Sequence, residues 1–126
     1  MARMIRVKRV YDPPEESDGV RVLVDRLWPR GLSKDDARVY LWLKELAPST
    51  ELRRWFAHEP ERWTEFKQRY YRELARCREA LEAIQEYARS STVTLLYAAK
   101  DGRHNNAVAL REYFEHELKP AAGGAR

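Results

Sequence analysis

The sequence predicts a single α/β domain, in which a small, mostly parallel or mixed sheet of about four strands carries helices on its faces. The most apolar run, 92–99, lies between two segments whose apolar residues have helical spacing. In addition, 126 residues of which 44% are hydrophobic suffice for one domain with a buried core. We place this domain at 4–119 and expect 120–126, which lacks large hydrophobic residues, to be a disordered tail.

Two strands are predicted near the N-terminus. In 4–11, the apolar residues Ile5 and Val7 alternate with basic ones, which is typical of a strand with one solvent-exposed face. The segment 12–19 contains two prolines, four acids and a glycine, so we expect a mobile loop there. The run 20–24 ends in three consecutive apolar residues and predicts a second strand covered on both faces.

Short elements are predicted in the next part of the chain. Ser33 is a good N-cap and acids follow it, so a short helix begins there. The segment 39–43 fits a strand or a helical face, and its β-branched and aromatic residues favour the strand. A second short helix begins at Ser49, and Pro60 ends it and begins the next one.

Apolar residues then recur every three or four positions over 61–89. One straight helix of this length would be about 43 Å long, at roughly 1.5 Å per residue. A domain of this size is only about 36 Å across, so we expect a bend or break near 76–79. Pro120 ends a last predicted helix, whose inner stripe is Ala107, Leu110, Tyr113, Phe114 and Leu118.

Composition and motifs exclude several classes of protein. Lys and Arg exceed Asp and Glu by 24 to 20, which indicates first a well-solvated surface and next an anionic partner. The single cysteine, Cys77, allows no disulfide within the chain, and no run has membrane-spanning length. Metal-ligand spacing and the dinucleotide, P-loop and nucleophile-elbow fingerprints are absent. We therefore expect a cytoplasmic protein with no metal, cofactor or membrane partner.

Two polar clusters follow predicted strands and form the candidate site. The first, 25–31, contains an acid, two arginines, a tryptophan and a Pro-x-Gly turn. The second, 100–106, follows the apolar run 92–99 and leads into the last helix. Ligands of open α/β sheets bind beyond the carboxyl ends of the strands, so we predict that these clusters meet in one pocket.

The residue types in these clusters predict a site for a small anionic ligand, namely a phosphate, a nucleotide or a carboxylate. Whether the protein is an enzyme stays open. If it is one, Asp25 or His104 would transfer the proton. The predicted ligand-binding residues are Arg26, Trp28, Arg30, Lys100, Arg103, Asn105 and His58.

Most of these residues also have a structural interpretation. Asp25 fits equally well as an ion-pair partner of a neighbouring arginine, and Trp28 as a lid packed over the core. Asn105 or Asn106 also fits a helix N-cap, and His58 a cap or turn residue.

Two other functions compete with the anion site. One is a protein-interaction domain without a ligand, and the other is a nucleic-acid-binding module with a phosphate-facing surface. The basic residues proposed for that surface include Arg3, Arg6, Lys8, Arg9 and Arg21.

Three segments, 25–31, 52–63 and 94–101, also carry a resemblance. Together they resemble the short, YeaO-like members of the DUF488 family of bacterial proteins, over about 5–118. The resemblance implies a compact cytosolic α/β domain and no particular reaction. The recurrent positions of the family correspond to Asp25, Arg26, Trp28, Pro29, Arg30, Gly31, Trp55, Phe56, His58, Pro60, Trp63 and the polar turn 101–106.

Overall fold

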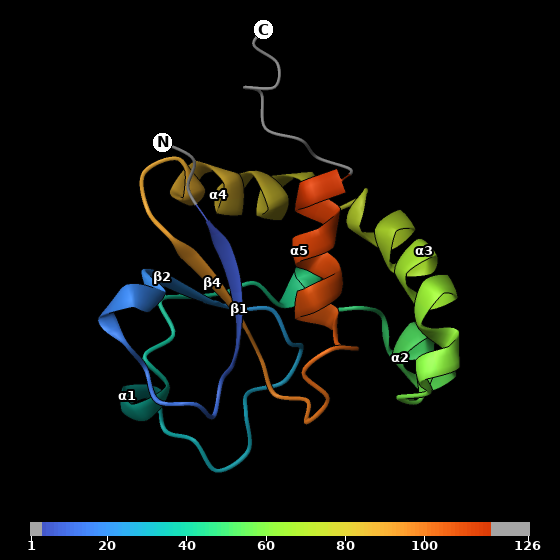
Figure 1. Ribbon diagram of the computed structural model, residues 1–126, viewed down its shortest axis with the longest axis horizontal. Coiled ribbons are helices and arrows are strands. Elements are labelled where there is room, and N and C mark those ends of the chain that lie inside the picture. The colour runs from blue at the N-terminus through green and yellow to red at the C-terminus, as the bar shows by residue number, and fades with distance from the viewer. Residues whose placement is uncertain (1–3, 117–126) are drawn as a thin grey trace, which may run out of the picture.

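The computed structural model describes residues 4–116. Within this range, four strands form one sheet in the order β1-β4-β2-β3, and every neighbouring pair is parallel (Figure 1). The strands are β1 (Ile5–Arg9), β2 (Val20–Leu23), β3 (Leu41–Trp42) and β4 (Val93–Tyr97). The predicted α/β class is therefore confirmed. The predicted tail, Leu118 and Pro120 lie outside the described residues.

β3 is shorter than predicted, because only Leu41 and Trp42 meet the ladder geometry. The backbone N–H groups of Tyr40 and Leu43 still donate to carbonyl groups of β2, each at 2.9 Å. The strand interpretation of 39–43 is therefore confirmed over the helical one.

Five α-helices connect and cover the strands within residues 4–116. None of them combines the length and hydrophobicity needed to cross a bilayer. They are α1 (Lys34–Ala37), α2 (Thr50–Phe56), α3 (Trp63–Leu74), α4 (Arg78–Ala88) and α5 (Asn106–His116), with 3-10 turns at η1 (Glu16–Asp18), η2 (Lys44–Leu46) and η3 (Pro60–Arg62).

The predicted helix boundaries follow from local chemistry. Ser33 and Ser49 cap α1 and α2, each accepting a hydrogen bond from a first-turn N–H through its side chain. Pro60 begins η3, which leads into α3. The chain breaks between α3 and α4 at Cys77, whose backbone is not helical, so the predicted break is confirmed.

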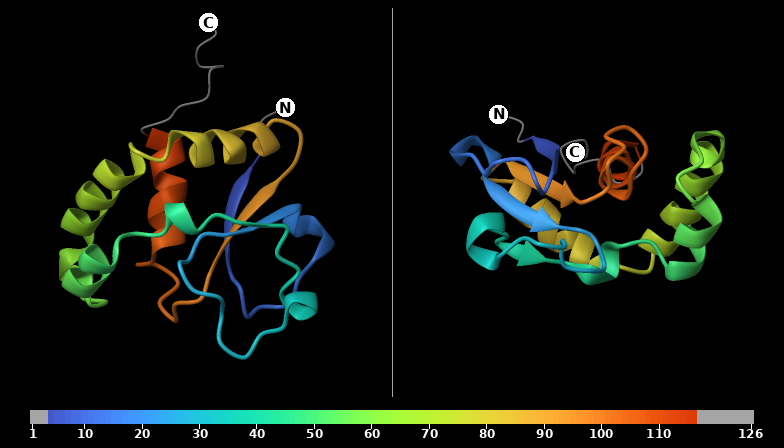
Figure 2. Two further views of the ribbon diagram at one scale, coloured as in Figure 1. Left: turned by 180° about the vertical axis from the view of Figure 1, so that it is seen from behind. Right: turned by 90° about the horizontal axis from the view of Figure 1, so that it is seen from below.

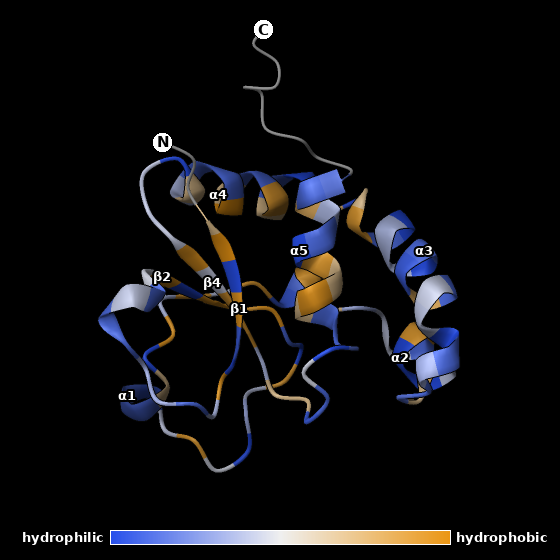
Figure 3. Ribbon diagram, in the orientation of Figure 1, coloured by the Kyte–Doolittle hydropathy of each residue, from blue (hydrophilic) through white to orange (hydrophobic). Residues whose placement is uncertain are grey.

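The main core lies between one face of the sheet and the helices α2 to α5, as the right-hand view of Figure 2 shows. Alternate residues of β4, Val93, Leu95 and Tyr97, point to this side. The hydrophobic stripe of α4 faces the strands in Figure 3. Burying each large apolar side chain contributes roughly 1.5–3 kcal/mol, so this face supplies most of the driving force for folding.

The opposite face of the sheet carries a smaller apolar cluster of Val10, Leu23, Ala37 and Leu96. It is covered by α1 and by long connections rather than by long helices. Because this apolar cluster is small, the edge of this second face leaves room for buried polar groups.

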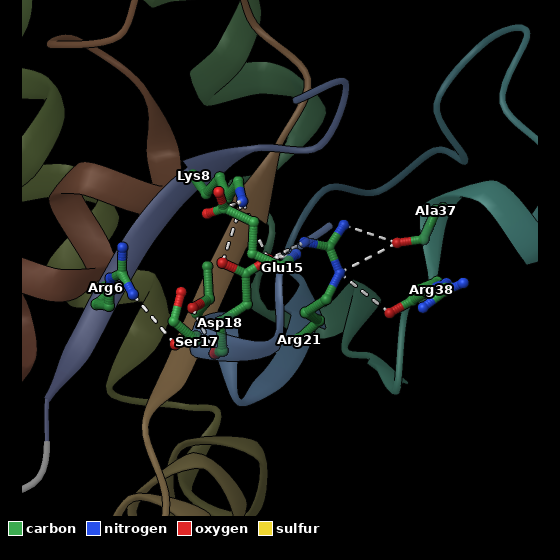
Figure 4. A network of polar contacts seen from close by, with 9 residues as sticks. Arg6, Lys8, Glu15, Ser17, Asp18, Arg21, Ala37 and Arg38 are labelled. Carbon is green, nitrogen blue, oxygen red and sulfur yellow. Dashed lines mark hydrogen bonds and ion pairs between the residues drawn. The ribbon is translucent and has the colours of Figure 1, made fainter. Parts of the chain in front are cut away.

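Asp18 is the centre of a buried polar network on this second face (Figure 4). Its carboxylate is fully buried and accepts from Arg21 Nη1 at 2.6 Å and from Lys8 Nζ at 3.1 Å. The hydroxyl of Thr94 donates to its backbone oxygen at 2.6 Å. Burial raises the pKa of Asp18, but hydrogen bonds from Glu15 N–H, Lys8 and Arg21 outweigh it, so the net pKa is lowered.

This network corrects two predictions. The segment 12–19, predicted as a mobile loop, ends in η1 and is anchored to β1, β2 and β4 through Asp18. Arg21 is only 5% exposed and donates to the backbone oxygens of Ala37 and Arg38. Arg21 and Lys8 therefore do not form the predicted phosphate-facing surface, because their charges are used inside the protein.

Replacing Asp18 by alanine should lower the free energy of unfolding by about 3–5 kcal/mol, since buried Arg21 loses the acid that it pairs with and Lys8 keeps only the exposed Glu15. Urea denaturation would measure the change. The matched control is Glu16→Ala, an exposed acid of the same turn, which should stay within about 0.5 kcal/mol of the parent protein. Equal effects of both variants would contradict the role given to Asp18.

Candidate functional site

The two polar clusters meet at the carboxyl ends of β2 and β4, as the sequence predicts. Asp25 Oδ2 accepts the backbone N–H of Ala98 at 2.9 Å. Asp25 Oδ1 accepts Asn106 Nδ2 at 3.0 Å, and the same nitrogen donates to the carbonyl oxygen of Val24 at 2.9 Å. One carboxylate therefore joins the end of β2, the end of β4 and the first residue of α5.

A pocket of about 570 Å³ opens beside this junction. The loops after β2 and β4 form one part of its wall, and α2 forms another. Phe56 and Phe66 contribute aromatic surface. The polar and charged lining residues are Asp25, Arg26, Arg30, Thr50, Arg53, Arg54, His58, His104, Asn105 and Asn106.

Four arginines line this pocket, two from the loop after β2 and two from α2. Arg26 and Arg30 were predicted from the sequence as ligand-binding residues, whereas Arg53 and Arg54 were not. The sequence does show them as an adjacent basic pair within 52–63. Only the packing of α2, however, brings this pair to the ends of the strands. None of the four arginines forms an ion pair with an acid of residues 4–116, and Arg26 donates to the Pro48 carbonyl oxygen at 3.3 Å.

Asp25 is the acidic residue of the lining, and its environment is that of a structural group. Burial raises the pKa of Asp25, and the hydrogen bonds from Asn106 and Ala98 and the charge of Arg53 only partly oppose this effect. Both oxygens already accept a hydrogen bond, and neither forms an ion pair with Arg26 or Arg30. The Asp25 side chain therefore holds the ends of β2 and β4 together, and this structural role requires no proton transfer.

His104 is held by Asp101 at the edge of the pocket. Its Nδ1 lies 3.0 Å from Asp101 Oδ2, and its ring packs edge-on against Trp63 with 5.3 Å between the ring centres. Because an ionised carboxylate only accepts hydrogen bonds, Nδ1 of His104 carries a proton and donates it to Asp101. The N–H of Arg103 and the His104 side chain lower the pKa of Asp101 to about 2.

Of the other predicted residues, some line a hollow and one stabilises the helix beside it. His58 lines the pocket, and Lys100 lines an adjoining hollow. Arg103 lines neither, so it is not brought to the predicted site. Asn105 is buried and caps α5 by accepting the N–H of Val108 at 2.9 Å.

Trp28 lines the pocket but is also packed. Its Nε1 donates to the carbonyl oxygen of Leu32 at 2.6 Å, and its ring meets Trp42 edge-on at 5.4 Å. These contacts match the lid interpretation. Among residues 4–116, no three His, Cys, Asp or Glu side chains are grouped so that they could hold a metal ion.

Comparison with known proteins gives the family. The model that matches residues 4–126 is described as the inactive DUF488-N3 subclade, so the chain belongs to the DUF488 family. It is 45% identical to the uncharacterized protein YeaO of Escherichia coli over 109 residues, covering 86% of this chain and 95% of YeaO. It is 44% identical to the uncharacterized proteins Mb3100c of Mycobacterium bovis and Rv3073c of Mycobacterium tuberculosis, covering 86% of this chain and 91% of each. No solved structure gives a significant match.

Replacing Asp25 by asparagine should destabilise the fold by about 1–3 kcal/mol, because an amide nitrogen would then face one of two N–H donors. Chemical denaturation measures this change. Asp35→Asn, at an exposed position of α1, is the control and should be close to neutral. An equally stable Asp25→Asn protein would show that the hydrogen bonds of the Asp25 carboxylate are not needed for stability.

The Asp101 carboxyl should remain ionised down to about pH 2, below its ordinary pKa of 3.8. Its lowered pKa means that its stabilising contribution is complete above pH 3.8 and is lost as the pH falls toward 2. A carbon-detected NMR titration of the side chain measures the midpoint. His104→Ala should raise that midpoint, and an unchanged midpoint would exclude the Asp101–His104 contact.

Proposed function

We propose that this domain binds a small anionic ligand, a phosphate ester, a nucleotide or a carboxylate, in the pocket at the ends of β2 and β4. The observation that carries the proposal is the charge of the lining. Four arginines face one aspartate, and both oxygens of that aspartate already accept hydrogen bonds. The arginines are therefore left with positive charge that an external anion would neutralise.

Size and chemistry support the same ligand class. A pocket of about 570 Å³ lies in the range of small-molecule sites, roughly 300–1,000 Å³. The guanidinium group matches carboxylates and phosphates with two parallel hydrogen bonds. Arg26 and Arg53 come from different elements, so they would hold an anion from two sides.

We propose binding without turnover as the main role. The description of the matching subclade as inactive supports this choice. The two oxygens of Asp25 already accept hydrogen bonds, which leaves His104 as the better candidate for a base. In a binding protein, Nε2 of His104 would form a hydrogen bond with the ligand instead of removing its proton.

Nucleic acid is the less favoured partner. Lys8 and Arg21 of the proposed basic surface are paired with Asp18, and Arg6 donates to the Ser17 carbonyl oxygen at 3.1 Å. The four arginines of the pocket, by contrast, form no ion pair with an acid of residues 4–116. We expect the protein to work in the cytoplasm, where its one free thiol, Cys77, would stay reduced.

Phosphate, sulfate or a nucleotide should raise the melting temperature, because ligands that bind only the folded state stabilise it. Arg26→Ala should abolish most of this rise, and Arg53→Ala should weaken binding about tenfold or more through the loss of a charged hydrogen bond. Thermal shift assays across a panel of phosphate esters and carboxylates would measure both effects.

The control for this experiment is Arg72→Ala, because Arg72 is exposed on α3 and does not line the pocket. It should leave every ligand-induced shift unchanged. No stabilisation by any anion of the panel would contradict the proposed function.

A further inference from the structure

A second hollow adjoins the pocket. It is lined by Arg9, Tyr11, His58, Ala98, Ala99, Lys100 and Asp101. Four of these seven residues, Tyr11, His58, Ala98 and Ala99, also line the first pocket. The two hollows therefore share a boundary and open on the same end of the sheet.

Each hollow has positive charge of its own. The first has the four arginines against Asp25, and the second has Arg9 and Lys100 against Asp101. Arg9 is held in place, since its Nε donates to the Ala99 carbonyl oxygen at 3.0 Å and its guanidinium lies 4.8 Å from the centre of the Tyr11 ring. Lys100 is exposed and forms no ion pair with an acid of the described chain, residues 4–116.

The boundary between the hollows is built from constrained residues. Tyr11 donates its hydroxyl hydrogen to the Arg30 carbonyl oxygen at 2.8 Å, which ties it to the loop after β2. His58 has φ 57° and follows Ala57 at φ 47°, so two successive residues other than glycine adopt the left-handed conformation. Such a conformation costs of order 1–3 kcal/mol per residue and is concentrated at ligand-binding sites.

We infer that the two hollows form one composite site for a ligand with two anionic groups. One group would lie among Arg26, Arg53 and Arg54, and the other between Arg9 and Lys100. The part of the ligand that joins them would pass over Tyr11 and His58. This inference rests on the proposed function, because it names the kind of anion that the pocket takes.

The test uses isothermal titration calorimetry of the full chain with simple probes. Methylphosphonate has one anionic group, and alkane bisphosphonates of increasing chain length have two. We expect affinity to rise at least tenfold at one optimal chain length, because the second group adds a charged contact. Lys100→Ala should remove this gain and leave methylphosphonate affinity within about twofold of the parent. Arg53→Ala should weaken both classes of probe.

Lys34→Ala, an exposed lysine on α1 that lines neither hollow, is the matched control and should change nothing. If methylphosphonate binds but no bisphosphonate binds more tightly, or if Lys100→Ala keeps the gain, the composite site is overturned and the single anion pocket survives. If neither class of probe binds, the proposed function itself fails.

Discussion

The carboxylate of Asp25 is the constraint on which the candidate site depends. A half-buried carboxylate needs hydrogen bonds to offset its lost hydration, and its two donors here come from Ala98, just after β4, and from Asn106, the first residue of α5. These bonds join the end of β2 to two segments that lie more than seventy residues further along the chain. Because neutral donors satisfy this acid, the arginines around it keep their charge available. A pocket that is both positively charged and rigidly connected to the sheet follows from that one arrangement.

β2 has a buried or half-buried acid beyond each of its ends, and the two acids use positive charge differently. Asp18, before the strand, pairs with Lys8 and Arg21, so those cations are neutralised inside the protein. Asp25, after the strand, accepts hydrogen bonds from amide groups instead. The chain has a net charge of only +4, but four arginines of one hollow and Arg9 and Lys100 of the next lie at the same end of the sheet. The net charge of the chain therefore does not locate a binding site. The partners of Asp18 and Asp25 decide which cations are neutralised inside the protein and which remain available to a ligand.

The candidate site could be predicted in part. Arg26, Arg30 and His104 could be predicted because polar residues that directly follow buried parallel strands all lie at the same edge of the sheet, beyond the carboxyl ends of the strands. Arg53 and Arg54 were missed because nothing local shows where α2 packs. That packing depends on Glu73 of α3, whose carboxylate accepts the N–H and the hydroxyl of Ser49 at 2.8 and 2.6 Å. Arg103 is not brought to the pocket, since the turn organised by Asp101 orders its backbone but does not place its side chain in the lining of either hollow.

The sequence alone determined the elements and their order, because strand periodicity, serine caps and the break near Cys77 depend on residues that are neighbours in the chain. It also placed the two polar clusters at strand ends. Only the tertiary structure decided which acids pair with which cations, that the segment before β2 is anchored, and that α2 closes the pocket. These outcomes depend on contacts between distant segments, whose energies come from burial and geometry that no short stretch of sequence contains.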